Sequence, residues 1–329
     1  MILAGDIGGT KTYLGRFVVE AGRPVPVDIR SFHTLSYSGL EEMVWDFLAG
    51  QADVEVAAFG IPGPVVNGRV DVTNVPWSLE TKSLARSLKL HTVHLLNDLV
   101  ATGYGIQAIS GDDLLVLNDG VGTEQQTEAL IAAGTGLGEC VLHWHGDGRT
   151  VLPCEAGHAA FAPHDMLQAE LLRYLQRSTR YVCQERVLSG PGLVNIYNFL
   201  RDTDRLPENK EVVEAMRESD PAAVIAAHAE SNDDELSCRA MEMFLTAYGS
   251  EAGNLAVRTM ALGGVYVGGG IAPKIAKLLA RGEFMRAFVE KERMEELMVQ
   301  IPVRVILDDR TALRGAALLA HQSTQVRAQ

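Results

Sequence analysis

The chain has 329 residues, of which 47% are hydrophobic and 22% charged, and its formal net charge is −13. This composition is typical of a globular protein with a sizeable core, and the acidic balance argues against binding to nucleic acid or anionic membranes. We expect a cytoplasmic protein without a signal peptide or membrane span. Met1 leads directly into a strand, no apolar run is long enough to cross a bilayer, and none of the four cysteines forms a CxxC pair.

The chain begins with a predicted strand, a glycine turn and a second strand. Ile2 and Leu3 start the first strand, and residues 13–19 alternate between two faces, a period that indicates a strand. A P-loop or a dinucleotide fingerprint needs a helix directly after its glycines, so both are disfavoured here.

The turn between these strands is a candidate anion site. Gly8 and Gly9 can take positive φ and let the backbone approach a ligand closely, and the N–H groups of the turn can then form a concavity, to which Thr10 and Thr12 add hydroxyl donors. Asp6, at the end of the first strand, is a candidate for holding Mg²⁺ through water. An ordinary type I′ hairpin accounts for the Gly-Gly pair equally well.

The first half continues as alternating strands and helices. Expected strands are 25–33, 54–59 and 93–96, expected helices are 39–48, 78–88 and 99–106, and an Asn-Gly hairpin is expected at 65–70. Asn97 and Asp98 follow the last of these strands. Asp98 is positioned to accept a hydroxyl proton, although both residue types are also common helix N-caps.

The second half repeats the opening plan. Strands are expected at 129–133 and 139–144, separated by a turn that contains Gly134, Thr135 and Gly136. This internal repeat predicts an α/β fold of duplicated domains with a boundary near residues 110–113. Further elements are expected at 149–152, 167–176, 193–200, 210–218, 221–228, 233–260, 264–267, 304–307 and 311–321, with a helix starting at Ile271.

Several polar residues and glycines in this half are candidate ligands. Glu155 and His158 lie in a predicted loop and can present an acceptor and a polar ring to sugar hydroxyls, and Glu185 can do the same. Taken alone, each of these three residue types more often has a structural role than a functional one. Zinc at Cys154, His143 and His145 is disfavoured because no cysteine pair accompanies them. Gly268, Gly269 and Gly270 are expected at a helix N-terminus, beside a nucleotide base or ribose or in tight packing.

Six blocks of sequence, in this order and spacing, resemble the bacterial glucokinase family of the actin-like ATPase superfamily over the whole chain. They are Asp6 to Thr10, Leu96 to Asp98, Ala133 to Gly138, Glu155 to His158, Glu185 to Asn195 and Gly268 to Gly270. The resemblance implies two duplicated actin-like, ribonuclease H-like ATPase domains flanking a central cleft, with residues 1–110 plus 311–329 as the small domain and 111–310 as the large one. It also favours a homodimer.

The resemblance implies roles for each block. Asp98 would be the base that takes the proton of the glucose 6-hydroxyl. The sugar's other hydroxyls would be bound by Asn97, Glu155, His158 and Glu185. Two turns would hold the ATP phosphates. The first contains Gly8, Gly9, Thr10 and Lys11, and the second contains Gly134, Thr135 and Gly136. Asp6 would position Mg²⁺, and Gly268, Gly269 and Gly270 would flank the adenosine.

Some residues depart from the family pattern. Lys11 stands where relatives often carry Asn, and residues 61–64, Ile-Pro-Gly-Pro, are more similar to the neighbouring repressor–kinase group. That group's cysteine-rich zinc motif and N-terminal helix-turn-helix are missing. A kinase for another hexose or an N-acetylated amino sugar, and a non-catalytic sugar-sensing regulator, therefore remain as alternatives, as do ADP and polyphosphate as phosphoryl donors.

Overall fold

The computed structural model describes residues 1–51, 53–123, 125–146, 148–203 and 205–326. The chain divides into two compact units. Unit 1 comprises residues 1–110, 148–153 and 308–329, and unit 2 comprises residues 111–147 and 154–307. The glycine turn at Gly8 belongs to unit 1, and the turn at Gly134 belongs to unit 2.

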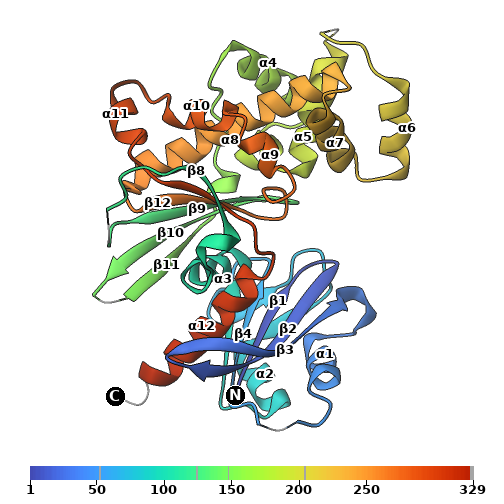
Figure 1. Ribbon diagram of the computed structural model, residues 1–329. Helices are drawn as coiled ribbons and strands as arrows, with labels where there is room; N and C mark the ends of the chain where they lie inside the picture. The colour runs from blue at the N-terminus through green and yellow to red at the C-terminus, as the bar shows by residue number, and fades with distance from the viewer. Residues whose placement is uncertain (52, 124, 147, 204, 327–329) are drawn as a thin grey trace. The chain divides into compact units, whose positions relative to one another are not determined.

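Unit 1 is built on a five-stranded sheet in the order β3-β2-β1-β4-β7 (Figure 1). The strands are β1 (Ile2–Ile7), β2 (Lys11–Glu20), β3 (Arg23–His33), β4 (Val56–Ile61) and β7 (Thr92–Asn97), and a separate small hairpin joins β5 (Arg69–Asp71) to β6 (Ser78–Glu80). The β1–β2 and β2–β3 pairs are antiparallel, whereas β1–β4 and β4–β7 are parallel. Because β1, β4 and β7 are parallel, their carboxyl ends lie at one edge, which is where α/β sheets gather ligands.

Helices cover both faces of this sheet. On one face, α1 (Leu40–Leu48) and α2 (Thr81–Leu88) pack their apolar residues against Leu3, Leu14 and Phe59. The other face carries α3 (Asp98–Gly105) and α12 (Thr311–Val326). These two helices touch through glycines, since a Cβ on Gly105 would lie 1.9 Å from the Thr311 carbonyl oxygen and one on Gly315 would lie 1.8 Å from that of Ala101.

The second sheet has six strands in the order β11-β10-β9-β12-β13-β8, and all of them except β11 lie wholly in unit 2. Its strands are β8 (Leu114–Asn118), β9 (Glu128–Ala133), β10 (Leu137–His145), β11 (Gly148–Cys154), β12 (Gly264–Gly268) and β13 (Val303–Ile306). As in unit 1, the strand before the glycine turn pairs antiparallel with the strand after it and parallel with a later one, because β9 is antiparallel to β10 and parallel to β12. The strands expected around both glycine turns are confirmed, and the period-two pattern of residues 13–19 correctly predicted β2.

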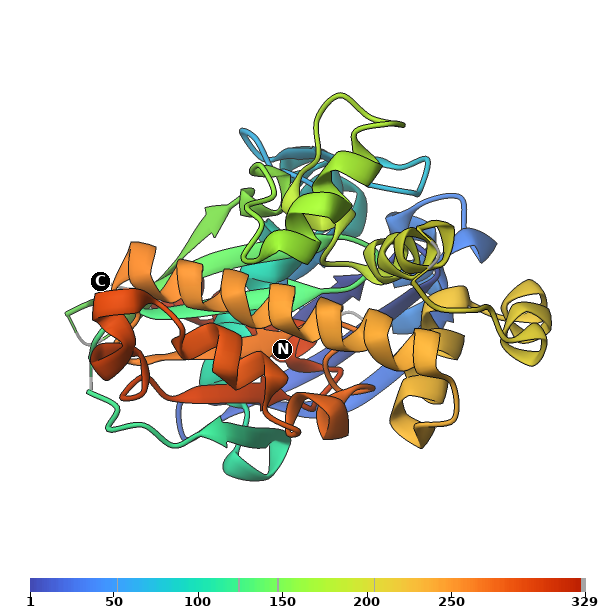
Figure 2. The same cartoon turned by 90° about the horizontal axis from the view of Figure 1, so that it is seen from above.

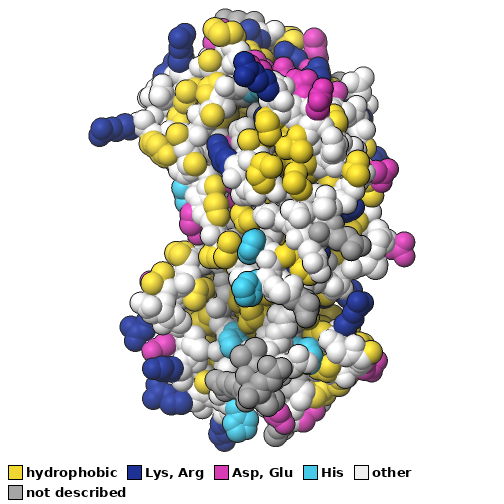
Figure 3. Space-filling view, turned by 90° about the vertical axis from the view of Figure 1, so that its left-hand side faces the viewer, with side chains coloured by type: hydrophobic (Ala, Val, Ile, Leu, Met, Phe, Trp, Pro, Cys, Tyr) yellow, Lys and Arg dark blue, Asp and Glu magenta, His cyan; other side chains and the backbone are white. Residues whose placement is uncertain are grey.

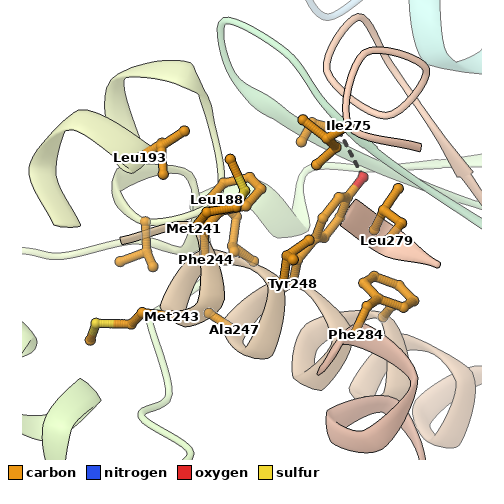
Figure 4. Packing of buried hydrophobic residues seen from close by; sticks show 14 of the residues in the cluster. Leu188, Leu193, Met241, Met243, Phe244, Ala247, Tyr248, Ile275, Leu279 and Phe284 are labelled. Atoms are coloured by element: carbon orange, nitrogen blue, oxygen red, sulfur yellow. Dashed lines mark hydrogen bonds between the residues drawn. The ribbon is translucent and has the colours of Figure 1, made fainter. Parts of the chain in front are cut away.

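Helices of unit 2 cover this sheet with one large hydrophobic core. They are α4 (Met166–Leu175), α5 (Gly190–Asp202), α6 (Lys210–Glu218), α7 (Pro221–Ser231), α8 (Glu235–Thr259), α9 (Ala276–Leu279), α10 (Glu283–Val289) and α11 (Glu295–Met298). The 25-residue helix α8 crosses unit 2 as a single straight element in the view of Figure 2. Figure 4 shows its Tyr248 packed near Phe244 and Phe284, with the tyrosine hydroxyl at the end of a hydrogen bond.

The structure differs from the sequence-based expectation in several places, and the short helices α10 and α11 were not predicted. Ser78–Glu80 forms strand β6 before helix α2, so the helix expected from residue 78 begins at Thr81. No helix starts at Ile271; residues 269–275 form turns, and the four-residue α9 begins only at Ala276. The edge strand β8 was not predicted, because its partly buried residues lack a clear alternation.

The surface in Figure 3 carries charged side chains of both signs. On the face shown in Figure 3, Lys and Arg side chains stand at several separate places among Asp and Glu rather than forming one continuous patch. Within the described ranges, no helix combines the length and apolarity that crossing a membrane requires.

Candidate functional site

The first glycine turn is a tight reversal that Thr34 holds in place. The Gly8 N–H donates to the Lys11 carbonyl at 3.1 Å. The buried Thr34 hydroxyl donates to the Gly8 carbonyl at 2.7 Å, and the Thr34 N–H donates to the Thr10 carbonyl at 2.9 Å. The Gly8 and Thr10 carbonyls therefore point toward Thr34, a residue that no sequence pattern singled out.

Two expectations about this turn are wrong. Neither Gly8 nor Gly9 has a positive φ, which also excludes a type I′ turn. Gly8 is needed for a different reason, because a Cβ there would lie 2.6 Å from the Lys11 carbonyl oxygen. The Thr12 hydroxyl is buried and lies 2.9 Å from that of Thr34, so it cannot serve a ligand.

The turn retains donors that face outward. Thr10 and Lys11 are exposed. Across the part of the chain that the structure describes, the N–H groups of Gly9 and Thr10 have no hydrogen-bond acceptor. Two adjacent unpaired N–H groups and an ammonium are a donor set suited to a phosphate.

Three carboxylates influence one another at the carboxyl end of β1. Burial, together with the negative charges of Asp98 and Asp309, raises the pKa of Asp6 from 3.8 to about 7. Asp98 is the first residue of α3, and Asp309 lies two residues before α12. A cation beside Asp6 would offset the repulsion from the two neighbouring carboxylates, and oxygen donors are what Mg²⁺ prefers. Asp6 therefore fits the role of holding Mg²⁺ through water.

Asn97 caps the helix that begins at Asp98. Its side-chain oxygen accepts from the N–H groups of Leu99 at 3.0 Å and Val100 at 3.3 Å, and its amide nitrogen donates to the Gly63 carbonyl at 3.3 Å. The cap predicted for this residue is confirmed. Only one amide N–H of Asn97 then remains for a ligand. Asp98 accepts from the Leu99 N–H through one carboxylate oxygen, at 2.9 Å.

The second glycine turn lies against Glu185. The Gly134 N–H donates to the Gly136 carbonyl at 2.8 Å, and Thr135 is exposed. The Glu185 carboxylate accepts from the Leu137 N–H at 3.1 Å, and a Cβ on Gly136 would lie 2.3 Å from that carboxylate. Sequence reasoning placed Gly136 and Glu185 in different roles, whereas the structure puts them in contact.

The loop that carries Glu155 and His158 rests on the strand after this turn. Residues 156–158 form a single 3₁₀ turn, and a Cβ on Gly157 would lie 2.0 Å from the Leu137 carbonyl oxygen. Because Gly157 allows this close approach, the loop is fixed while the side chains of Glu155 and His158 are exposed. The prediction of a loop rather than a helix is confirmed here.

Gly268, Gly269 and Gly270 lie beside the same turn. Gly269 has φ +83°, and a Cβ there would meet the Ala133 carbonyl oxygen at 2.4 Å, so only glycine fits. Gly270 is exposed with open space around it. The expectation of a helix N-terminus here is wrong, because turns follow; Gly269 instead provides the close approach to β9.

Buried polar residues that the sequence did not single out support unit 2. The Tyr248 hydroxyl accepts from the Ala133 N–H at 3.2 Å, directly before the second glycine turn. Gln184, next to Glu185, donates to the Glu251 carboxylate at 2.8 Å. Burial and the charge of Glu251 raise the pKa of the neighbouring Glu139 from 4.5 to about 8. These residues come from elements far apart in the sequence, so no local pattern indicates them.

Metal ligation by protein side chains alone finds no support. Outside the seven residues whose placement is not described, no group of three or more His, Cys, Asp or Glu side chains could hold a metal ion. A divalent cation near Asp6 would therefore need water and ligand oxygens to complete its coordination.

Comparison with known proteins identifies the class and then the family. A solved glucokinase from an Antarctic psychrotroph has a TM-score of 0.85 at 26% identity, covering 98% of both chains. A glucokinase of the ROK family from Streptomyces griseus, solved with glucose and AMPPNP, has a TM-score of 0.65 at 22% identity and covers 98% of this chain and 99% of its own. The mixed α/β fold is thus that of sugar kinases.

Sequence comparison is more specific. The glucokinase of Nostoc sp. is 40% identical over 97% of this chain and 98% of its own. The profile of the Glucokinase family matches residues 3–323. The chain belongs to the Glucokinase family, which confirms the resemblance found in the six sequence blocks.

Proposed function

We propose that this protein phosphorylates glucose at its 6-hydroxyl with ATP. The observation that carries the proposal is the match to the Glucokinase family along almost the whole chain. The geometry supports it, because each unit presents a glycine turn at the carboxyl end of its central strand, and acidic side chains flank both turns.

Asp98 is assigned as the general base. The Asp98 carboxylate would take the proton from the 6-hydroxyl as the sugar oxygen attacks the γ-phosphorus and ADP leaves. Its place at the start of α3 keeps one carboxylate oxygen on the Leu99 N–H and fixes the side chain. Asn97, through its remaining N–H, and Glu155, His158 and Glu185 are assigned to the sugar's other hydroxyls.

The nucleotide is assigned to the two turns. N–H groups and side chains of Gly8, Gly9, Thr10 and Lys11 in unit 1 and of Gly134, Thr135 and Gly136 in unit 2 would hold the phosphates, and Gly268, Gly269 and Gly270 would flank adenosine. Mg²⁺, held by Asp6 through water, would supply charge neutralisation on the phosphates. Support comes from the unpaired N–H groups of the first turn and the raised pKa of Asp6.

The same proposal covers the domain organisation. Residues 1–110 plus 311–329 and residues 111–310 would be duplicated actin-like domains flanking a central cleft. The matching strand orders of the two sheets support duplication. A cytoplasmic homodimer completes the proposal.

A coupled assay of ADP release over a panel of sugars tests the function. Turnover with glucose and ATP above all other pairs is expected. Turnover with another hexose or an N-acetylated amino sugar would favour the alternative kinase, and glucose binding without turnover would favour a regulator. Replacing ATP with ADP or polyphosphate in the same assay identifies the donor.

A further inference from the structure

The segment before α12 reaches the first glycine turn through Tyr13. Asp6 and Tyr13 are directly opposite each other on β1 and β2, so their side chains share one face of the sheet. That face is the one covered by α3 and α12, and the ring of Tyr13 packs against its apolar core. Tyr13 is therefore held between the sheet and the start of α12.

Hydrogen bonds join three side chains in a row. The Tyr13 hydroxyl donates to the Asp309 carboxylate at 2.8 Å. The Lys11 ammonium donates to the same hydroxyl and lies 4.2 Å from the centre of the Tyr13 ring. Residues 13 and 309 are 296 positions apart in the sequence, so the hydrogen bond between them depends on the folded unit.

The Tyr13 hydroxyl donates on one side and accepts on the other. Because the Tyr13 hydroxyl gives its one hydrogen to Asp309, it acts toward Lys11 only as an acceptor, and the ammonium is the donor. One of three N–H donors of Lys11 is used in this way, which leaves two. The Lys11 carbonyl is fixed as well, since it accepts from the Gly8 N–H. Backbone and side chain of Lys11 are thus both tied to the turn.

We propose that Tyr13 and Asp309 are positioning residues that hold the Lys11 ammonium beside the Gly9 and Thr10 N–H groups, where it binds a nucleotide phosphate. Without them, an exposed lysine samples many rotamers, and ordering it on binding lowers affinity. The inference rests on the proposed nucleotide site but assigns two residues that the six motif blocks do not contain.

Binding of Mg-ADP, measured by titration calorimetry on the full-length protein, tests the proposal. Tyr13→Phe keeps the ring and removes only the hydroxyl. We expect the Kd of Mg-ADP to rise about three- to tenfold, the equivalent of one net hydrogen bond, with the glucose KM unchanged. Thermal unfolding of the variant checks that the ring still packs.

Two substitutions at Asp309 separate positioning from charge. Asp309→Asn keeps an oxygen acceptor for the Tyr13 hydroxyl, whereas Asp309→Ala removes it. We expect Asp309→Ala to weaken Mg-ADP binding as Tyr13→Phe does, and Asp309→Asn to leave the affinity equal or improved, because a negative charge near the phosphates is lost. Equal weakening by both substitutions would contradict the positioning role.

A double-mutant cycle decides whether Tyr13 acts through Lys11. In a Lys11→Met background, Tyr13→Phe is expected to change the Kd by less than about twofold. An undiminished effect in that background would overturn the proposal, because the hydroxyl would then act by another route. If the variants show this coupling in Mg-ADP binding but the wild-type protein turns over no sugar, the proposed function alone is refuted. Turnover without any coupling would refute the positioning role alone, and no Mg-ADP binding would refute both.

Discussion

Replacing Asp6 by Asn should stabilise the protein at alkaline pH, because the Asp6 carboxyl opposes folding once it ionises. Its pKa is raised from 3.8 to about 7 by burial and by the charges of Asp98 and Asp309. At 1.36 kcal/mol per pKa unit, this difference lowers the free energy of unfolding by about 4 kcal/mol when the carboxyl is ionised in both states.

Because the pKa of Asp6 is raised in the folded state, the pH range in which stability is lost can be stated. A carboxyl with a raised pKa in the folded state opposes folding only above its unfolded value, so the loss of stability grows from about pH 4 to pH 7 and is constant above that range. Asp6→Asn lacks this loss. Near pH 3.5 we expect variant and wild type to be about equally stable, apart from any effect of replacing a carboxyl by an amide. At pH 8 we expect the thermal unfolding midpoint of the variant to be roughly 10 °C higher.

Differential scanning calorimetry between pH 4 and 8 measures this difference. Asp309→Asn is a matched control, because it removes one of the two charges that act on Asp6 and should give a smaller rise at pH 8. A stability difference between Asp6→Asn and wild type that does not depend on pH would refute the reasoning.

Three further predictions concern unit packing and the second turn. Gly136→Ala places a Cβ 2.3 Å from the Glu185 carboxylate and should raise the glucose KM at least about tenfold while circular dichroism stays unchanged; an unaltered KM would remove Glu185 from the sugar site. Gly315→Ala drives a Cβ to 1.8 Å from the Ala101 carbonyl oxygen, so urea unfolding should show a loss of about 3 kcal/mol or more, and a loss below 1 kcal/mol would contradict the contact. Glu139→Gln should become more stable relative to wild type as pH rises from 4.5 to about 8, since Glu139 has a raised pKa; a flat difference in thermal scans would contradict this.

Local sequence patterns predicted the parts of the fold that local physics determines. Alternating residues identified the strand after the first glycine turn, and the repeated glycine turn identified the second strand–turn–strand unit. The Asn-Gly pair at 67–68 forms the expected tight turn with φ of 51° and 74°. The cap at Asn97 was likewise readable, because a side-chain oxygen reaches N–H groups two and three residues on.

Tertiary contacts explain what the sequence could not indicate. Gly8 and Gly269 were both noticed as glycines, but Gly8 is required by the Lys11 carbonyl and Gly269 by the Ala133 carbonyl 136 residues away in the chain. Asp309 was missed because its partner Tyr13 is 296 residues distant. The helix expected at Ile271 failed because a first-turn proline permits a helix without requiring one.

The role of Asp98 is the central claim of the proposed mechanism. Rapid-quench measurement of glucose 6-phosphate formed by Asp98→Asn, with glucose affinity measured in parallel, tests it most directly. The substitution keeps the shape and the oxygen that accepts from the Leu99 N–H, so we predict a fall in the rate of about 10²- to 10⁴-fold with glucose affinity within about threefold of wild type. A rate within a few-fold of wild type would contradict the assignment of Asp98 as the base.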